Sequence, residues 1–545
     1  MIAARSVITK HGAIIIWIFI VGAYLTIKAI PENSWDGWQV GSAQALLSAK
    51  HWVNDSFFKN YFLFLPQGYS KVTRYFDDPE LRQHARGITT GGFIGKRLYY
   101  THYPFGYIIP TALLMKLGAE SRFWFRLLQI LFSLIGLVFL YWVFYLISNR
   151  LVASLGILFY SISTIFLDYA DSLAAMPLEE LLRPIIIFLS ILSLKNNQKK
   201  YFNYLIWIFY FILSLSSYDS TFFIFAWLVG LDLIVSKKTN FKKWIFWVSA
   251  PILAFGVQIL QNYLYLGWRD MILDFYGAFK VQLVGSRTNF FLTHLQRWFD
   301  PLGWFFGVKW YLGIIISVLG IWSLKFIKKY SDIQLDIRYL YLAFLALLFH
   351  FLFFPSLFFY QGRLVAIFGA LLMGSLTSAS IKEMIRVLKT NTSIQRCIVV
   401  FVIFIMVLGL WFIQGKRTYT YIKQWPNNIW PQASIDFDKK IKNLVSSDKV
   451  IFQLLGSERK VSDLDRYPMA ASEDEYHTDA PILGFTNTAD LIRDFNYLKQ
   501  RSEFPFSAII IANQKTIIEK LDQKLTDYKK TSIEKIGDKF IMVIL

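Results

Sequence analysis

The stretch RFWFRLLQILFSLIGLVFLYWVFYLI, residues 122–147, decides the fold class of this chain. Two arginines stand near its start, and no charged residue follows as far as Ile147. A helix of this length and polarity can cross a hydrocarbon core of about 30 Å. Comparable apolar stretches recur through the first three quarters of the 545 residues, of which 55% are hydrophobic and 18% aromatic. The sequence therefore predicts a polytopic α-helical membrane protein.

About eleven transmembrane helices are predicted, and the basic loops between them set the topology. The stretch at 103–118 is apolar but short, and it holds two prolines and two glycines, so we expect it in or on the outer leaflet. All Lys- and Arg-rich loops then fall on one side, which makes that side cytoplasmic. This predicts a multi-pass protein of the plasma (inner) membrane with a cytoplasmic N-terminus. The predicted spans are 13–31, 122–147, 151–167, 180–194, 202–217, 220–236, 244–264, 308–328, 339–355, 364–381 and 397–415.

Two hydrophilic segments, 32–121 and 416–545, are then extracytoplasmic. The first begins with VGSAQALLSAKHW, an amphipathic pattern expected to form a helix along the interface, and continues to a predicted hairpin at GGFIGKRLYYTHYPFGY. The second alternates buried-strand patterns (VIFQLL, FSAIIIAN, KFIMVIL) with amphipathic helical patterns (ADLIRDFNYLKQ, KTIIEKLDQKLTDY). That order predicts a small α/β domain. We therefore expect a transmembrane domain at 1–415 and a soluble domain at 416–545.

The composition excludes several functions. The net charge of +20 comes from basic residues in short loops between apolar stretches, which encodes topology and gives no reason to expect a nucleic-acid partner. Cys397 is the single cysteine, so the chain has no internal disulfide and no Cys-rich zinc site. The seven histidines show no ligand-like spacing.

Ionisable residues at the membrane surface are costly unless they have a function, so the outer side is where we expect a site. Asp36 lies in WDGW, directly after the first span; taken alone, it reads as an interfacial residue between tryptophan anchors. The turn DYADSLAAMPLEELLRP adds Asp168, Asp171, Glu179 and Glu180. Guanidinium groups suit phosphate binding. The cationic candidates on this side are Lys96, Arg97, His102, Arg122, Arg126, Arg269, Arg287 and Arg363.

The order of these features resembles the GT-C membrane glycosyltransferases, and among them the branch of protein O-mannosyltransferases and lipid A aminoarabinose transferases. An aspartate follows the first span, THYPFGY precedes LGAESRFWFR with Arg126, and FFPSLFFYQGRLVAIFGALL precedes a late span. The chain departs from the pattern at Gly37, where the family has an acidic residue. It departs again at His102 and Tyr103, where a lysine is expected, and SSYDST replaces an expected Thr-Lys. The family's second acidic residue falls on or near Glu179 or Glu180, with Asp171 as the other candidate.

The resemblance implies a GT-C-like fold and inverting transfer of a sugar from a polyprenyl-phosphate donor to a lipid, glycan or protein acceptor on the outer face. Asp36 would be the base, or would orient the acceptor hydroxyl. No cofactor is specified, although Asp36 with Glu179 or Glu180 could hold a divalent cation. The partners implied are the lipid-linked donor, membrane lipids and the acceptor. Catalytic candidates are Asp36, Asp171, Glu179 and Glu180, and candidates for binding substrate or phosphate are Arg97, His102, Tyr103, Arg126, Arg269, Tyr360 and Arg363.

Three other functions stay open. A transporter or flippase would carry paired broken helices and charges near the membrane midplane, for which His350, Asp232 and Lys116 are the few candidates. A non-catalytic protein that keeps the fold is favoured by Gly37 and by the missing lysine. A membrane polymerase or ligase would differ mainly in using pyrophosphate-linked donors.

Overall fold

The computed structural model divides the chain into two compact units. The first covers Met1–Gly37, Ser121–Gln258 and Ser286–Asn428, and the second covers Trp38–Glu120, Ile259–Gly285 and Ile429–Leu545. The predicted domain boundary at 415/416 falls within a long helix of the first unit. The structure describes residues 2–31, 34, 36–58, 61–64, 101, 104–195, 200–284, 290–328, 335–353, 359–389, 394–425, 432–444, 449–454, 478, 480–485, 488–502, 507–526, 528–537 and 539–545.

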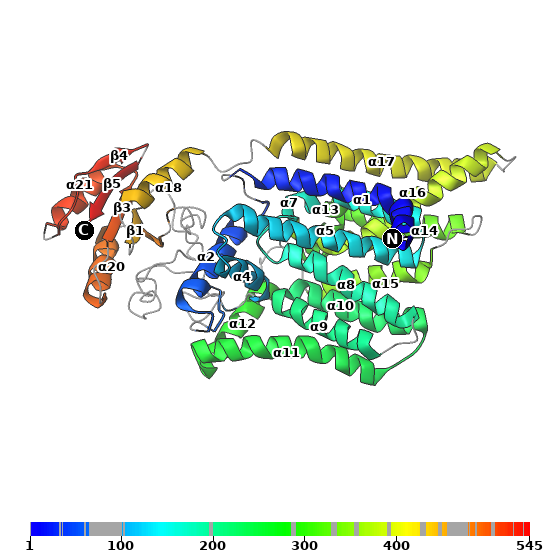
Figure 1. Ribbon diagram of the computed structural model, residues 1–545, viewed down its shortest axis with the longest axis horizontal. Coiled ribbons are helices and arrows are strands. Elements are labelled where there is room, and N and C mark those ends of the chain that lie inside the picture. The colour runs from blue at the N-terminus through cyan, green and yellow to red at the C-terminus, as the bar shows by residue number, and fades with distance from the viewer. Residues whose placement is uncertain are drawn as a thin grey trace. The chain divides into compact units, whose positions relative to one another are not determined.

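The first unit is a bundle of helices (Figure 1). Each predicted span falls on one or more of these helices. They are α1 (Ile2–Ala29), α5 (Arg122–Ile147), α6 (Arg150–Ser161), α7 (Thr164–Tyr169), α8 (Met176–Lys195), α9 (Lys200–Ser216), α10 (Tyr218–Gly230) with its π-helical extension η3 (Leu231–Ser236), α11 (Phe241–Leu266), α13 (Phe290–Phe306), α14 (Trp310–Lys328), α15 (Ile337–Phe353), the short 3-10 helix η4 (Phe359–Val365), α16 (Ala366–Lys389) and α17 (Ile394–Gln424).

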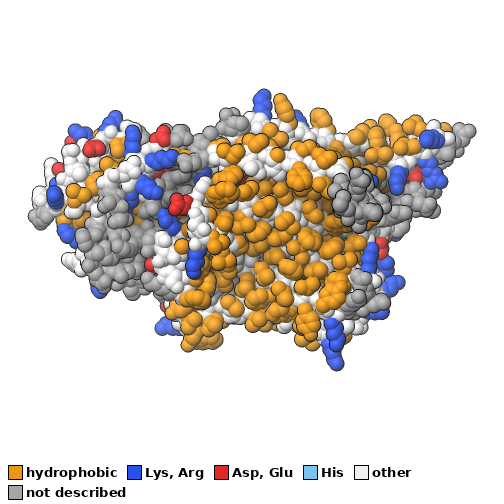
Figure 2. All heavy atoms as spheres, in the orientation of Figure 1, with side chains coloured by type: hydrophobic (Ala, Val, Ile, Leu, Met, Phe, Trp, Pro, Cys, Tyr) orange, Lys and Arg blue, Asp and Glu red, His pale blue; other side chains and the backbone are white. Residues whose placement is uncertain are grey.

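Among the described residues, seven helical stretches are long and apolar enough to cross a membrane. The stretch Phe359–Lys389 forms the centre of the bundle, because 94% of its most apolar 18 residues are buried. The same share for Arg396–Gln424 is 28%. Figure 2 shows hydrophobic side chains covering the visible face of this unit, with Lys and Arg gathered at the end where α16 ends and α17 begins. An apolar outer face of this extent needs lipid around it. The predicted polytopic membrane fold is confirmed.

The chain breaks its helical path where the candidate carboxylates lie. The predicted span 151–167 ends early, at Ser161, and helix restarts at Thr164 because the Ser163 hydroxyl accepts a hydrogen bond from the Phe166 amide at 3.2 Å. Residues 170–175 then turn into α8. Helices α5 and α8 approach closely, since a Cβ at Gly136 would collide with the backbone of Glu180. This approach places the start of α8 deep in the bundle.

The second unit joins short helices to a five-stranded sheet of order β2-β1-β3-β5-β4. Strands β1, β2 and β3 are parallel, and β5 and β4 run antiparallel to them. The three predicted strands and two predicted helices of this segment are confirmed, whereas β2 and β4 were not predicted. The elements are α2 (Gln39–Asp55), η2 (Gly106–Ile108), α4 (Ile109–Lys116), α12 (Trp268–Val284), α18 (Gln432–Leu444), β1 (Lys449–Leu454), β2 (Ile482–Phe485), α20 (Thr488–Arg501), β3 (Ser507–Ala512), α21 (Lys515–Lys524), β4 (Glu534–Ile536) and β5 (Lys539–Ile544).

Two other expectations for the segment 32–121 concern this unit. The amphipathic pattern forms α2, whose middle, from Gly41 to Trp52, is largely buried in protein. The apolar stretch 103–118 contains α4, whose eight residues are too few to cross a membrane. Most of the predicted hairpin at 91–107 lies outside the described residues.

Candidate active site

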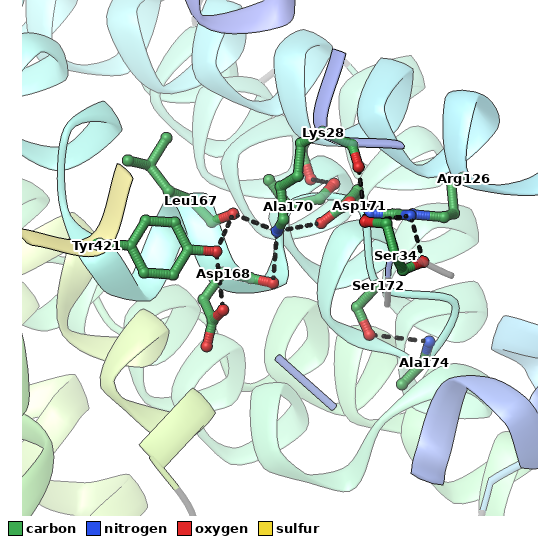
Figure 3. A network of polar contacts seen from close by, with 11 residues as sticks. Lys28, Ser34, Arg126, Leu167, Asp168, Ala170, Asp171, Ser172, Ala174 and Tyr421 are labelled. Carbon is green, nitrogen blue, oxygen red and sulfur yellow. Dashed lines mark hydrogen bonds and ion pairs between the residues drawn. The ribbon is translucent and has the colours of Figure 1, made fainter. Parts of the chain in front are cut away.

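A buried carboxylate joins three parts of the first unit. Asp171, in the turn after α7, pairs through Oδ1 with Lys28 Nζ at 2.9 Å and through Oδ2 with Arg126 Nε at 3.1 Å (Figure 3). Lys28 lies in the last turn of α1 and Arg126 in the first turns of α5. All three side chains are buried. Burial alone would raise the pKa of Asp171, but the charges and hydrogen bonds of Arg126 and Lys28 lower it below its usual value.

The same two cations also bind backbone carbonyls, one just before Asp36 and one in α7. Arg126 Nη1 donates to the Ser34 carbonyl at 2.8 Å, and Lys28 Nζ donates to the Leu167 carbonyl at 2.8 Å. Asp36 lies two residues after Ser34 and is only 2% exposed. The donors of Arg126 are thus directed to Asp171 and Ser34.

Gly37 is explained by a close approach of Asp168. A Cβ at position 37 would collide with the Asp168 carboxylate, and the Gly37 amide donates to the Asp168 carbonyl at 3.0 Å. The carboxylate of Asp168 therefore occupies the space that a side chain at residue 37 would take, next in the sequence to Asp36. The family that the sequence resembles has an acidic residue at this position, next to its aspartate. Here a carboxylate from a different loop fills the place.

Asp168 is the residue that the sequence left in a group of four without assigning it a role. Burial raises its pKa above the usual value, while Lys28 and a hydrogen bond from Tyr421 lower it and the charge of Asp171 raises it. The Tyr421 hydroxyl donates to Asp168 Oδ1 at 2.9 Å. The DYAD spacing pointed to this loop, but nothing in the sequence linked it to a tyrosine 253 residues later.

Tyr169 connects this pair of aspartates to η4. Burial and the negative charges of Asp168 and Asp36 raise the pKa of Tyr169, and the charge of Arg363 lowers it, so all three groups lie within electrostatic range of its phenol. Its ring meets the ring of Tyr360 edge to face, with 6.1 Å between centroids. Tyr360, which was expected at the site, therefore lies beside Tyr169, and Arg363 acts on the same phenol as the two aspartates.

A second polar cluster surrounds the start of α8. Glu180 pairs with Arg183 and, at 3.2 Å, with Arg363 Nε. Glu179 accepts a hydrogen bond from the Ser220 hydroxyl at 2.9 Å. Among the described residues, no acceptor is placed for Nη1 or Nη2 of Arg363, although this side chain is buried. The phenol of Tyr160 lies close to the same guanidinium.

The remaining predicted residues fall elsewhere. Arg97, His102 and Tyr103 lie outside the described residues, and Arg269 is exposed on α12 in the second unit. Within the described part of the chain, no three His, Cys, Asp or Glu side chains are grouped to hold a metal ion. Glu180 does not fit the metal ligation that we considered with Asp36, because two arginines already match its charge.

Comparisons with known proteins support the architecture. No family model matches the chain, and no curated protein matches it. The crystal structure of ArnT from Cupriavidus metallidurans bound to undecaprenyl phosphate is similar over 98% of each chain, with a TM-score of 0.52 and 10% identity. The apo form of that protein matches over 91% of this chain and 98% of its own, with a TM-score of 0.43 and 12% identity. The Archaeoglobus fulgidus oligosaccharyltransferase matches over 86% of this chain and 68% of its own, with a TM-score of 0.43 and 9% identity.

Proposed function

We propose that this chain, which has the GT-C fold of membrane glycosyltransferases, transfers a sugar from a polyprenyl-phosphate carrier to an acceptor hydroxyl. The similarity that supports this extends over both chains almost completely, and the matching structure was determined with undecaprenyl phosphate bound. Fold similarity alone does not assign an activity, so the proposal depends on the residues of the site.

The observation that carries the proposal is the Asp168 carboxylate lying against Gly37, the residue after Asp36, with both aspartates acting on the phenol of Tyr169. Asp36 is buried, follows the first long helix and lies beside Gly37, whose missing side chain makes room for Asp168. A second negative charge nearby makes a carboxylate a stronger base, because it disfavours the charged form of its neighbour. We assign Asp36 as the base, and Asp168 as the group that raises its basicity.

Arg363 is the group best placed to bind the donor phosphate. Its Nε is held by Glu180 at 3.2 Å, which fixes the guanidinium, while Nη1 and Nη2 have no acceptor among the described residues. A phosphate oxygen would satisfy these donors with charge-assisted hydrogen bonds. The charges of this cation and of both aspartates act on the phenol of Tyr169.

These residues support a single inverting displacement. The acceptor hydroxyl gives its proton to Asp36 while its oxygen attacks the anomeric carbon. The bond between that carbon and the phosphate oxygen breaks on the opposite face, and the polyprenyl phosphate leaves with the electron pair. Arg363 stabilises the negative charge that the leaving phosphate gains. The configuration at the anomeric carbon is inverted.

Other features of the sequence fit this proposal. Lys and Arg gather at the end of the bundle where α16 and α17 meet, and we assign that end to the cytoplasm and the site to the opposite face. We keep residues 1–415 as the transmembrane catalytic domain and 416–545 as the soluble domain. Asp171 would hold the site together, and Glu179 and Glu180 would orient hydroxyls or Arg363. Arg126 would act with Asp171, and candidates for further contacts with the donor are Arg97, His102, Tyr103, Arg269 and Tyr360.

The test uses the purified protein in lipid discs with a panel of polyprenyl-phosphate sugars. Asp36→Asn should lower turnover by about 10²–10⁴, the usual contribution of a positioned base, with little effect on the binding of undecaprenyl phosphate. Asp436→Asn, at an exposed position of α18, is the matched control and should retain full turnover. The proposal fails if the wild type consumes no donor, or if Asp36→Asn turns over as fast as the wild type.

A further inference from the structure

We propose that Tyr421, near the end of α17, is a positioning residue whose hydroxyl keeps the Asp168 carboxylate in place against Gly37, the residue that follows Asp36. This inference rests on the proposed function, because it assigns Tyr421 to the same reaction. Tyr421 touches neither of the reacting groups that we assign above, so it would act through Asp168.

The contacts of Asp168 show why a second anchor is needed. Its backbone carbonyl accepts from the Gly37 amide at 3.0 Å and from Lys28 Nζ at 3.3 Å, which fixes the main chain. The side chain is held separately, by the Tyr421 hydroxyl at 2.9 Å from Oδ1 (Figure 3). The same hydroxyl lies 3.4 Å from the Leu167 carbonyl, a longer contact, so the carboxylate is its main acceptor.

The end of α17 is docked so that Tyr421 faces this loop. Thr418 Oγ1 donates to the Ile162 carbonyl, and Arg417 Nη1 donates to the Trp304 carbonyl at 3.1 Å. Lys28 Nζ lies 4.4 Å from the ring centroid of Trp425, one helical turn beyond Tyr421. By contrast, Tyr419 is 67% exposed. The tyrosine at 421 is thus oriented by contacts on both sides of it in the sequence.

A hydrogen bond from a hydroxyl to a carboxylate stabilises the ionised form. Without it, Asp168 would take up a proton at a higher pH, and its charge would no longer make Asp36 a strong base. Every ionisable group near Asp168 has to be considered with it. Those groups are Tyr24 and Lys28 from α1, Asp36 from the segment that follows, Tyr169 and Asp171 from its own loop, and Tyr421 from α17.

The experiment compares Tyr421→Phe with Tyr419→Phe, its exposed neighbour on the same helix. With the donor that the wild type uses, Tyr421→Phe should lower kcat about tenfold, leave KM within about twofold, and move the acidic limb of the pH–rate profile up by about one unit. Tyr419→Phe should change none of these. The double variant Tyr421→Phe with Asp168→Asn should be no slower than Asp168→Asn alone, because both changes remove the same contribution.

Three results would overturn the inference. These are a similar loss in Tyr419→Phe, an additive loss in the double variant, or a lower rate with an unchanged pH profile, which would indicate a purely structural role. A separate measurement does not need turnover. Infrared titration of the carboxyl stretch, assigned by comparing wild type with Asp168→Asn, should show Asp168 protonating at a higher pH in Tyr421→Phe. An unchanged midpoint would refute the role of Tyr421 even if no donor is consumed, whereas absent turnover with a shifted midpoint would refute only the proposed function.

Discussion

Gly37→Ala is the sharpest test of the carboxylate pair. The added Cβ would lie 2.9 Å from Asp168 Oδ1 and still closer to the other two carboxylate atoms, whereas ordinary contact begins at 3.4 Å. The carboxylate must therefore move by about an ångström, and a displacement of that size costs about 10²-fold in rate. We expect kcat to fall by about that factor.

The fold should tolerate this change, which makes the prediction specific. The obstacle is the end of a side chain and not backbone, so we expect the free energy of unfolding to change by about 1 kcal/mol or less. Turnover in lipid discs and thermal unfolding, measured on the same preparation, separate the two effects. Gly12→Ala is the matched control, since a Cβ there meets nothing within 4 Å.

A second comparison identifies the colliding partner. In an Asp168→Ala background the collision is absent, so adding Gly37→Ala should cause little further loss. If Gly37→Ala turns over like the wild type, or if it slows the Asp168→Ala variant as much as it slows the wild type, the explanation of Gly37 is wrong.

Three more predictions concern the buried charges. Asp171→Asn leaves Lys28 and Arg126 buried without a counter-charge, so the free energy of unfolding should fall by about 3–5 kcal/mol, and a loss below about 1 kcal/mol would contradict the pairing. The fold lowers the pKa of Asp171, so the stability that Asp171 contributes is present above the usual pKa of aspartate and is lost as the pH falls through the folded value. The temperature of thermal unfolding should therefore fall below about pH 4 for the wild type. Asp171→Asn should not show this part of the pH dependence. In the second unit, burial raises the pKa of Asp494 to about 7, so stability is lost as the pH rises from the usual aspartate pKa through that value, and Asp494→Asn should slow hydrogen exchange in α20 more at pH 8 than at pH 5.

The membrane helices could be predicted from the sequence because hydropathy is a local property. In lipid an uncharged stretch such as 127–147 has to satisfy its backbone hydrogen bonds within itself, and a helix does so. The break at Ser163 was missed because a single hydroxyl, bonded to the Phe166 amide, ends an apolar stretch that composition alone would continue. Strands β2 and β4 were missed because four and three residues are too short to show a period.

The candidate site was only partly predictable. Asp36 and the DYAD loop could be named, because charges next to apolar stretches stand out. The pairing of Glu180 with Arg363 and of Asp168 with Tyr421 could not, since 253 residues separate the latter two and no local pattern records the contact. Gly37 looked like a departure from the family pattern, and only the position of the Asp168 carboxylate in space gives the reason.

The docking of α17 on the DYAD loop has a consequence for biosynthesis. Asp36 leaves the ribosome first, Asp168 follows, and Tyr421 emerges only with the last long apolar helix. A nascent chain can therefore bury Lys28 with Asp171 early, while Asp168 stays unanchored until that helix has inserted. The site would therefore become fully active only when α17, the last helix of the first unit, has inserted. A chain that ends before residue 394 should insert and bind lipid but should turn over slowly.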